Sequence, residues 1–257
     1  MTPSFLMKPF CSPRLGTALA LSALVLAGCA SAPSAHPQDP FESYNRSMSR
    51  FNDAVDEAVL KPVATGYQQA VPELARRGVS NFFANLGDAW SFVNNTLQWR
   101  GEAAMSSFFR FGINTVFGLG GVLDIATEMR LERHKQDFGL TLGRWGVPPG
   151  PYLVLPLLGP STVRDTLAWP VDSQGNLLKG VDDIPSRNSL YALRLVDTRA
   201  NFLRAGEMLD GAALDKYSFS RDVFLRVRSQ RAGIDRDMDR SAADEAADGS
   251  LPPEPEQ

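Results

Sequence analysis

Few side chains in this chain of 257 residues are of the types that catalyse reactions or bind metals. The two histidines are His36, among small residues and prolines, and His134, inside the charged run 130–135, where solvent exposure is expected. The sequence contains no HExxH, GxSxG or P-loop motif and no Cys/His cluster with metal-ligand spacing. These observations disfavour an enzyme and indicate neither a metal nor a cofactor.

Three aspartates, Asp124, Asp165 and Asp172, are the remaining candidates for acid–base chemistry. Such catalysis needs groups held within hydrogen-bonding reach of a substrate, a geometry that the spacing of these residues does not indicate. We expect Asp165 to form a structural ion pair with Arg164 or with another arginine.

Cys29 is the residue for which the sequence predicts a defined modification. The preceding residues contain two basic and no acidic side chains, and their apolar run 15–26 is too short to span a bilayer. The run ends in Leu-Ala-Gly-Cys, which resembles a bacterial lipobox, so we expect cleavage before Cys29 and a diacylglyceryl group on its sulfur. Attached acyl chains hold a protein stably on a membrane. Ala30 follows instead of the aspartate associated with inner-membrane retention, which favours the outer membrane.

Composition divides the chain into four segments. We expect a lipoprotein signal peptide at 1–28, an acylated flexible tether at 29–38, a folded domain at 39–234 and an acidic disordered tail at 235–257. Loss of the signal changes the formal charge from −3 to −5, because it removes Lys8 and Arg14 and no acid. The tail has eight acidic residues against two arginines, so the folded domain is near neutral. A nucleic-acid partner is therefore not expected.

The stretch 137–164 is rich in Gly and Pro, and most of its other residues are apolar. Exposed loops of this composition are usually polar, so the stretch is either buried under helices or in contact with lipid. Its prolines exclude a continuous helix, and only residues 152–155 have the pattern of a strand. We expect an irregular apolar hairpin, whose candidate channel or gate residues are Trp145, Val147, Tyr152, Val154, Leu155 and Leu157.

The rest of the domain is predicted to be helical. Asp39-Pro40 predicts a capped helix start, the apolar spacing that follows predicts one amphipathic helix, and Pro62 is expected to end it. A helix over 73–97 is expected to break near Gly87-Asp88. Helices are also predicted at 102–117, 162–169, 186–209 and 214–234. The helix at 102–117 is apolar on all sides, as in a helix that is buried or faces lipid. The fold class is all-α.

Several local strings together resemble the MlaA (VacJ) lipoprotein family over residues 39–228. They start with Asp39-Pro40-Phe41-Glu42 and Lys61-Pro62-Val63-Ala64, and the most specific ones lie in the apolar hairpin. The hairpin strings are Thr141-Leu142-Gly143, Trp145-Gly146-Val147, Gly150-Pro151-Tyr152 and Gly159-Pro160-Ser161-Thr162-Val163-Arg164-Asp165. Lys216 and Phe224 depart from the family pattern, where proline and tyrosine are usual.

The resemblance implies a ring-like, multi-helix domain embedded in one leaflet of the outer membrane, on its periplasmic side. It implies removal of mislocalised phospholipids from the outer leaflet through an amphipathic channel to a soluble periplasmic carrier, with a trimeric porin as membrane partner. Arg164 and Lys179 are then candidate contacts for the lipid phosphate. Two alternatives stay open: an envelope scaffold that binds a porin without transporting lipid, and a membrane-surface phospholipase.

Overall fold

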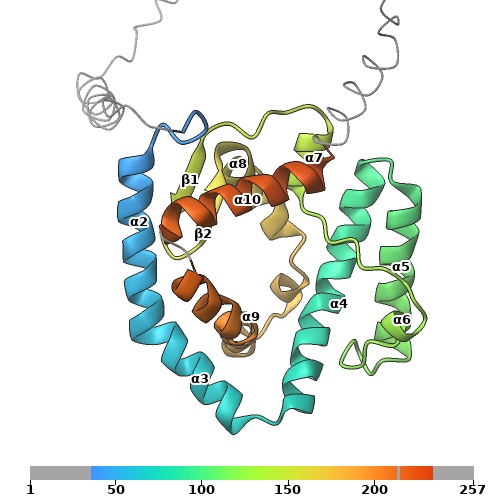
Figure 1. Cartoon of the computed structure of the whole chain (residues 1–257). Coiled ribbons are helices and arrows are strands. Elements are labelled where there is room, and N and C mark those ends of the chain that lie inside the picture. The colour runs from blue at the N-terminus through green and yellow to red at the C-terminus, as the bar shows by residue number, and fades with distance from the viewer. Residues whose placement is uncertain (1–35, 213–214, 234–257) are drawn as a thin grey trace, which may run out of the picture.

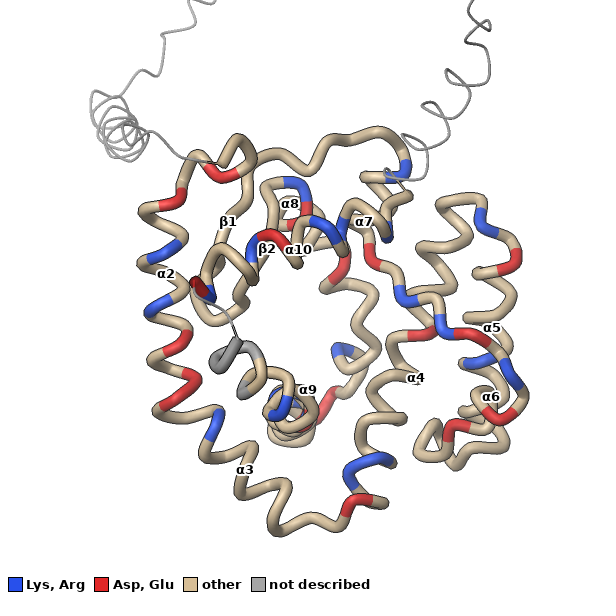
Figure 2. The backbone as a smooth tube through the Cα atoms, in the orientation of Figure 1, with Lys and Arg blue, Asp and Glu red and all other residues tan. Residues whose placement is uncertain are grey.

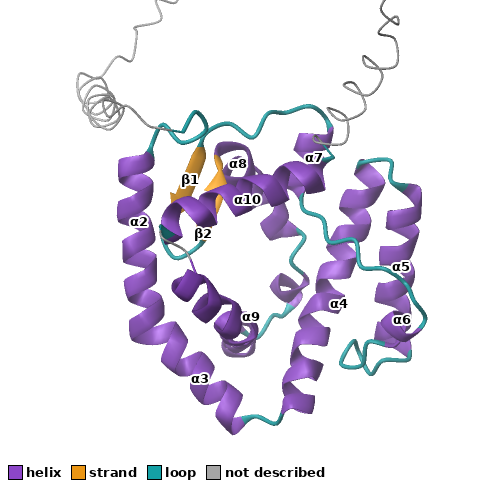
Figure 3. Cartoon of the chain, in the orientation of Figure 1, coloured by secondary structure: helices purple, strands orange, loops and turns teal. Residues whose placement is uncertain are grey.

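The computed structural model describes residues 36–212 and 215–233. Its helices and two strands surround a central opening, and the two ends of the described chain lie at the same edge (Figure 1). In chain order the elements are α2 (Glu42–Val55), η1 (Asp56–Leu60), α3 (Lys61–Ala70), α4 (Glu73–Leu97), α5 (Gly101–Val116), α6 (Ile125–Glu128), α7 (Phe138–Arg144), β1 (Tyr152–Leu155), β2 (Gly159–Thr162), α8 (Val163–Gln174), η2 (Leu177–Gly180), α9 (Ile184–Ala212) and α10 (Lys216–Ala232). The predicted all-α class is confirmed (Figure 3).

The first side of the ring is one continuous helical arm, so the prediction that Pro62 ends a helix is wrong. Between α2 and α3 the chain forms a π-helical turn, in which the amide of Lys61 donates to the carbonyl of Asp56. Proline lacks an amide hydrogen and its ring clashes with the carbonyl four residues earlier. The wider turn just before Pro62 places this residue in the first turn of α3, where both defects are tolerated.

Asp39 does not cap α2, contrary to the prediction. The helix begins at Glu42 without a side-chain cap, and the carboxylate of Asp39 is fully buried instead. It accepts hydrogen bonds from Asn45 Nδ2 (2.8 Å), the Tyr217 hydroxyl (2.5 Å) and Arg221 Nη1 (3.2 Å). The buried carboxylate thus ties the start of the domain to α10, because a charge out of water requires such partners.

The second side is formed by α4 and α5, which pack along each other. The expected break at Gly87-Asp88 does not occur, since α4 continues through both residues to Leu97. The buried face of α5 is small and polar, with Ala103, Ala104, Ser107, Arg110 and Asn114. Its large apolar side chains are exposed instead, among them Met105, Phe108, Phe109, Val116 and Phe117. This polarity is the reverse of that of a helix on the surface of a soluble domain.

Charge is also sparse on this side. Residues 89–99 and 111–123 contain no Lys, Arg, Asp or Glu, as the uncharged stretches of tube along α4 and beyond α5 show (Figure 2). No described helix is both long enough and apolar enough to cross a bilayer.

The predicted strand at 152–155 is confirmed as β1, which pairs antiparallel with β2 so that Tyr152 lies opposite Thr162 and Leu155 opposite Gly159. Tyr152 and Val154 are each 1 % exposed and form a core cluster with Tyr217 of α10. Asn45 of α2 fixes the register of this sheet against the arm, since its amide donates to the Tyr152 carbonyl (3.0 Å) and accepts from the Val154 amide (2.8 Å).

The long helix α9 closes the ring. Arg199 makes two hydrogen bonds to Asp56 in the π-helical turn, of 2.6 and 2.7 Å. Beside this pair, Ala200 and Leu203 of α9 form a small apolar cluster with Ala64 and Tyr67 of α3. The predicted helices at 102–117, 186–209 and 214–234 are confirmed with small changes in their ends, and the helix predicted at 162–169 extends to Gln174.

Candidate functional site

A cavity of about 1080 Å³ occupies the middle of the ring. Its wall is assembled from α4, residues 133–137, the segment from β1 to α8, η2, α9 and α10. Because each of these segments contributes side chains, the cavity exists only when the ring is closed. It exceeds the roughly 300–1,000 Å³ typical of small-molecule pockets.

The cavity is amphipathic. Large apolar side chains cover much of its wall: Phe83, Leu86, Trp90, Leu155, Leu158, Trp169, Leu177, Phe202 and Phe224. Polar and ionisable side chains cover the remainder, and they come mainly from α8, α9 and residues 133–137. A wall of this kind suits a ligand with an apolar part and a charged part.

The aspartates of the wall are held by protein donors. Asp172 accepts from the Trp90 indole N–H (2.8 Å) and the Phe138 amide (2.7 Å), and its partial burial raises the pKa of its carboxyl. Arg228 bridges Asp137 (2.5 Å) and Asp165 (2.8 Å), and these hydrogen bonds raise the pKa of the guanidinium although burial opposes them. These acids are engaged in structural contacts.

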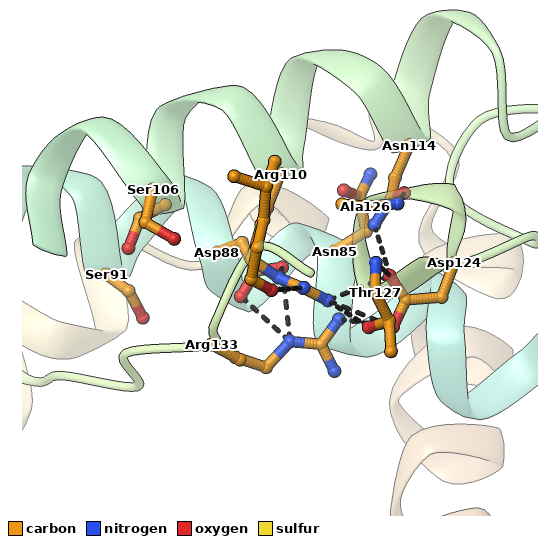
Figure 4. Close-up of polar contacts among 12 residues, drawn as sticks. Asn85, Asp88, Ser91, Ser106, Arg110, Asn114, Asp124, Ala126, Thr127 and Arg133 are labelled. Carbon is orange, nitrogen blue, oxygen red and sulfur yellow. Dashed lines mark hydrogen bonds and ion pairs between the residues drawn. The ribbon is translucent and has the colours of Figure 1, made fainter. Parts of the chain in front are cut away.

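A buried ion network supports the outer side of the cavity (Figure 4). Arg110 of α5 is 1 % exposed and pairs with Asp88 of α4 (3.3 Å) and Asp124 (2.8 Å). Arg133 pairs with the same two carboxylates at 3.2 and 3.3 Å, and Arg110 also donates to the Leu131 carbonyl. Asp88 and Arg133 belong to the cavity wall as well. The network therefore joins α4, α5 and the segment after α6 to the cavity.

The structure separates the predicted hairpin residues into three groups. Leu155 lines the cavity, together with Leu158, which was not among the predicted site residues. Tyr152 and Val154 are core residues of the wall and do not line this cavity.

Three further hairpin residues are exposed outside the cavity lining: Trp145, Val147 and Leu157. Trp145 donates its indole N–H to the Leu97 carbonyl at the end of α4 (3.1 Å). Leu157 has a φ of 62°, which an L-residue rarely adopts, and its amide donates to Asn52 Oδ1 (2.7 Å). These contacts hold the tip of the hairpin against the ring.

The two predicted phosphate contacts have different surroundings. The guanidinium of Arg164 is buried, donates to Asp165 (3.1 Å) and to the Val147 carbonyl (3.2 Å), and lies against Gly143. The expected pair between Arg164 and Asp165 is therefore present. Lys179 lines the cavity, and its ammonium donates to two neutral side chains, Ser173 (3.2 Å) and Gln174 (3.4 Å).

Sequence reasoning missed four cations of the wall: Arg133, Lys135, Arg194 and Arg228. Lys135 belongs to the charged run that we interpreted as solvent-exposed, and Arg194 was one of several arginines on the predicted helix 186–209. The available signal was a short polar segment that follows an apolar loop. The direction in which its side chains point depends on the closure of the ring, which the sequence does not show. Cys29 lies outside the described residues, and in these residues no group of His, Cys, Asp and Glu is placed to hold a metal ion.

A second cavity of about 930 Å³ lies between α3, α4 and α9 and shares Ser80 and Asn201 with the first. These two residues and Asp197 form a hydrogen-bonded cluster, with Ser80 Oγ to Asp197 at 2.8 Å and Asn201 Nδ2 to Ser80 Oγ at 2.9 Å. The Tyr67 hydroxyl adds a bond of 3.2 Å to Asp197. A polar partition thus separates the two spaces.

Comparisons with known proteins converge on one family. The model of a family described as "MlaA lipoprotein" matches residues 37–231. The chain is 35 % identical over 218 residues to the "Intermembrane phospholipid transport system lipoprotein MlaA" of Escherichia coli (strain K12), covering 82 % of this chain and 85 % of that one. The protein of the same description from Haemophilus influenzae is 36 % identical over 216 residues, covering 80 % and 85 %.

A shorter match, 39 % identical over 127 residues, relates the chain to an uncharacterised protein of Rickettsia typhi, about half of whose length (51 %) it spans. Among solved structures, one from a study described as "Structural basis for maintenance of bacterial outer membrane lipid asymmetry" superposes with a TM-score of 0.62 at 32 % identity. The superposition covers 76 % of this chain and 98 % of that chain.

Proposed function

Since the chain belongs to the MlaA lipoprotein family, we propose that it is an outer-membrane lipoprotein that moves phospholipids through its central cavity. In this proposal, it takes mislocalised phospholipid from the outer leaflet and passes it to a soluble periplasmic carrier, which preserves the lipid asymmetry of the membrane. The observation that carries the proposal is the amphipathic cavity of about 1080 Å³ enclosed by the ring.

The exposed apolar surface supports a position in one leaflet. Large apolar side chains cluster on the outside of α4, α5 and the turns that follow them, and Trp99, at 94 % exposed, stands at the turn between the two helices. The rings of Phe92 and Phe108 contact each other in a tilted arrangement (centroids 5.5 Å apart), and those of Phe108 and Phe109 contact edge to face (5.6 Å). Exposed apolar area of this kind indicates contact with a membrane or a protein. We propose that this side faces acyl chains and a trimeric porin, and that acylated Cys29 adds the anchor.

The chemistry of the cavity suits passage and does not suit bond cleavage. Moving a phospholipid requires an apolar wall for its acyl chains and polar groups for its head, and no covalent bond changes. Leu155 and Leu158 of the hairpin provide apolar wall, and Lys179 provides a cation for the phosphate. Arg164, by contrast, is occupied by Asp165 and Val147, so we assign it to holding the hairpin in place.

The hairpin is the proposed gate. Its tip at Leu157 depends on Asn52 of α2, which accepts from the Leu157 amide and donates to the Leu155 carbonyl (2.9 Å). These two hydrogen bonds to Asn52 tie residues 155–157 to α2. Their loss would allow Leu155 and Leu158 to move relative to the cavity.

A transfer assay tests the proposal. The acylated protein, purified in detergent, is loaded from phospholipid vesicles and mixed with the soluble carrier, and lipids in both fractions are identified by mass spectrometry. Transfer of intact phospholipid supports a channel. Lysophospholipid or free fatty acid among the products would indicate an esterase, and protein that neither binds nor passes lipid would indicate a scaffold.

A further inference from the structure

The ionisable side chains of the central cavity differ by sign in how they are paired. The aspartates of the wall accept hydrogen bonds from protein donors: Asp88, Asp137, Asp165, Asp172 and Asp197. Asp88 and Asp197 are 2 % and 4 % exposed, whereas the side chain of Asp137 is 36 % exposed. Protein donors thus already occupy these carboxylates and compete with a positively charged group of a ligand.

Three cations of the same wall are different. Among the described residues, Lys135, Lys179 and Arg194 form no ion pair with a carboxylate. Lys135 and Lys179 are exposed, and Arg194 is half-buried on α9. An anion that enters the cavity would therefore meet cations that no carboxylate of the described residues neutralises.

Lys135, in the segment before α7, and Arg194, on α9, line the same cavity. Desolvation lowers the pKa of the Lys135 ammonium, and the positive charges of Arg231, Arg194 and Arg133 lower it further. Ring closure has thus placed like charges on the wall of one cavity. Asp137, whose charge opposes this effect on the pKa, is already bound twice by Arg228.

We propose that Lys135 and Arg194 form a phosphodiester-binding site in the central cavity that prefers phospholipids with a net negative charge to zwitterionic ones. Arginine and lysine bind phosphate oxygens through charge-assisted hydrogen bonds. The ammonium of an ethanolamine headgroup would be repelled by these cations and would meet carboxylates to which protein donors are already bound, whereas a glycerol headgroup would not be repelled.

This inference rests on the proposed function, because it requires lipid to enter the cavity. The test uses the full acylated protein in detergent, loaded from vesicles of equal parts phosphatidylglycerol and phosphatidylethanolamine. The ratio of the two lipids bound to the protein is measured for the wild type and for K135Q/R194Q. The matched control is R187Q/R226Q, which removes the same charge at residues that do not line the cavity and form no ion pair among the described residues.

We expect the bound ratio of anionic to zwitterionic lipid to fall by about fivefold in K135Q/R194Q, which corresponds to about 1 kcal/mol, and to stay unchanged in R187Q/R226Q. If K135Q/R194Q does not fold, K135Q alone, at an exposed position, is expected to lower the ratio by a smaller factor. An unchanged ratio in folded variants that still bind lipid would overturn the headgroup site and leave the proposed function intact. Failure of the wild type to bind either lipid would overturn both.

Free inorganic phosphate would bind through the same contacts as the phosphate of a lipid headgroup. A second experiment distinguishes these two ligands. Inorganic phosphate is titrated into lipid-free protein and binding is followed by calorimetry. Phosphate binding that is lost in K135Q/R194Q, without a change in the lipid ratio, would contradict the assignment to a lipid headgroup.

Discussion

Removing Arg110 is the perturbation that best measures how the ring is held together. The substitution R110M replaces the unbranched stem of the side chain with one of similar length and removes the guanidinium with its charge. Asp88, whose side chain is 3 % exposed, would keep Arg133 at 3.2 Å but lose its buried partner at 3.3 Å, and the Leu131 carbonyl and Asp124 would lose a donor. Breaking a buried ion pair by removing one partner costs about 3–5 kcal/mol.

This cost is a large part of the 5–15 kcal/mol by which folded proteins are typically stable. For a domain of this size we expect the melting temperature to fall by about 6–20 °C, since 1 kcal/mol corresponds to about 2–4 °C. Thermal unfolding in detergent, followed by circular dichroism, measures the change. The matched control is R46Q, which breaks half-exposed pairs with Glu42 and Asp215 and should cost about 1 kcal/mol or less.

The loss in R110M should also depend on pH. Burial raises the pKa of Asp88, and the charges of Arg133 and Arg110 oppose this effect. Without Arg110 the pKa rises further, so the folded variant binds a proton more tightly than the unfolded chain does. The destabilisation is then largest above the folded-state pKa and decreases as pH falls towards it. An equal loss at pH 8 and pH 5, or a loss no larger than that of R46Q, would refute the assigned role of the network.

Two further predictions concern the wall of the cavity. G175A should lower the free energy of unfolding by about 1–3 kcal/mol, because the added Cβ would lie 2.1 Å from the Trp90 ring. The control G66A, where an added Cβ would meet nothing within 4 Å, should raise the free energy of unfolding by about 0.5–1 kcal/mol. Equal effects of the two substitutions in urea denaturation would contradict the packing of Trp90. V154D should unfold the protein, because Val154 is 1 % exposed and its replacement would bury a charge. L155D, in the cavity wall, should leave the protein folded and localised but raise the amount of phospholipid in the outer leaflet. A normal amount of phospholipid in the outer leaflet of the L155D strain would contradict the proposed gate.

The sequence-based predictions were accurate where the structure is determined by interactions between residues close together in the sequence. The strand at 152–155 and the helices at 186–209 and 214–234 follow from local patterns, and the structure confirms them. Asp39 has the sequence signature of a cap, but two α10 residues, Tyr217 and Arg221, bind its carboxylate from far along the chain. No local pattern encodes such a partner.

The errors at Pro62 and Gly87-Asp88 have related causes. A proline normally ends a helix, but the π-helical turn before Pro62 is held by the pair between Asp56 and Arg199 of α9. The sequence Gly87-Asp88 is typical of a break in a helix. In the structure Asp88 pairs with Arg110 of α5, and α4 continues through both residues. In both places tertiary contacts outweigh intrinsic helix propensity.

The candidate site was predicted only in part for the same reason. Leu155 and Lys179 line the cavity, and their roles in a gate and in a headgroup contact stay predictions. The expected ion pair between Arg164 and Asp165 is present. Lys135 is exposed, as expected for the charged run 130–135, but the sequence does not show that ring closure also places it on the cavity wall. The residues that define a cavity between distant segments become recognisable only once the ring is closed.

The central claim is that phospholipid occupies the cavity of the ring. The most direct measurement places a photoreactive benzoyl-phenylalanine at Tyr191, which lines the cavity, and at the control position Phe219, an exposed aromatic residue outside it. After purification in detergent, irradiation should yield a phospholipid adduct at Tyr191 that disappears when the soluble carrier is added first, and no adduct at Phe219. No adduct at Tyr191, or equal adducts at both positions, would contradict the account.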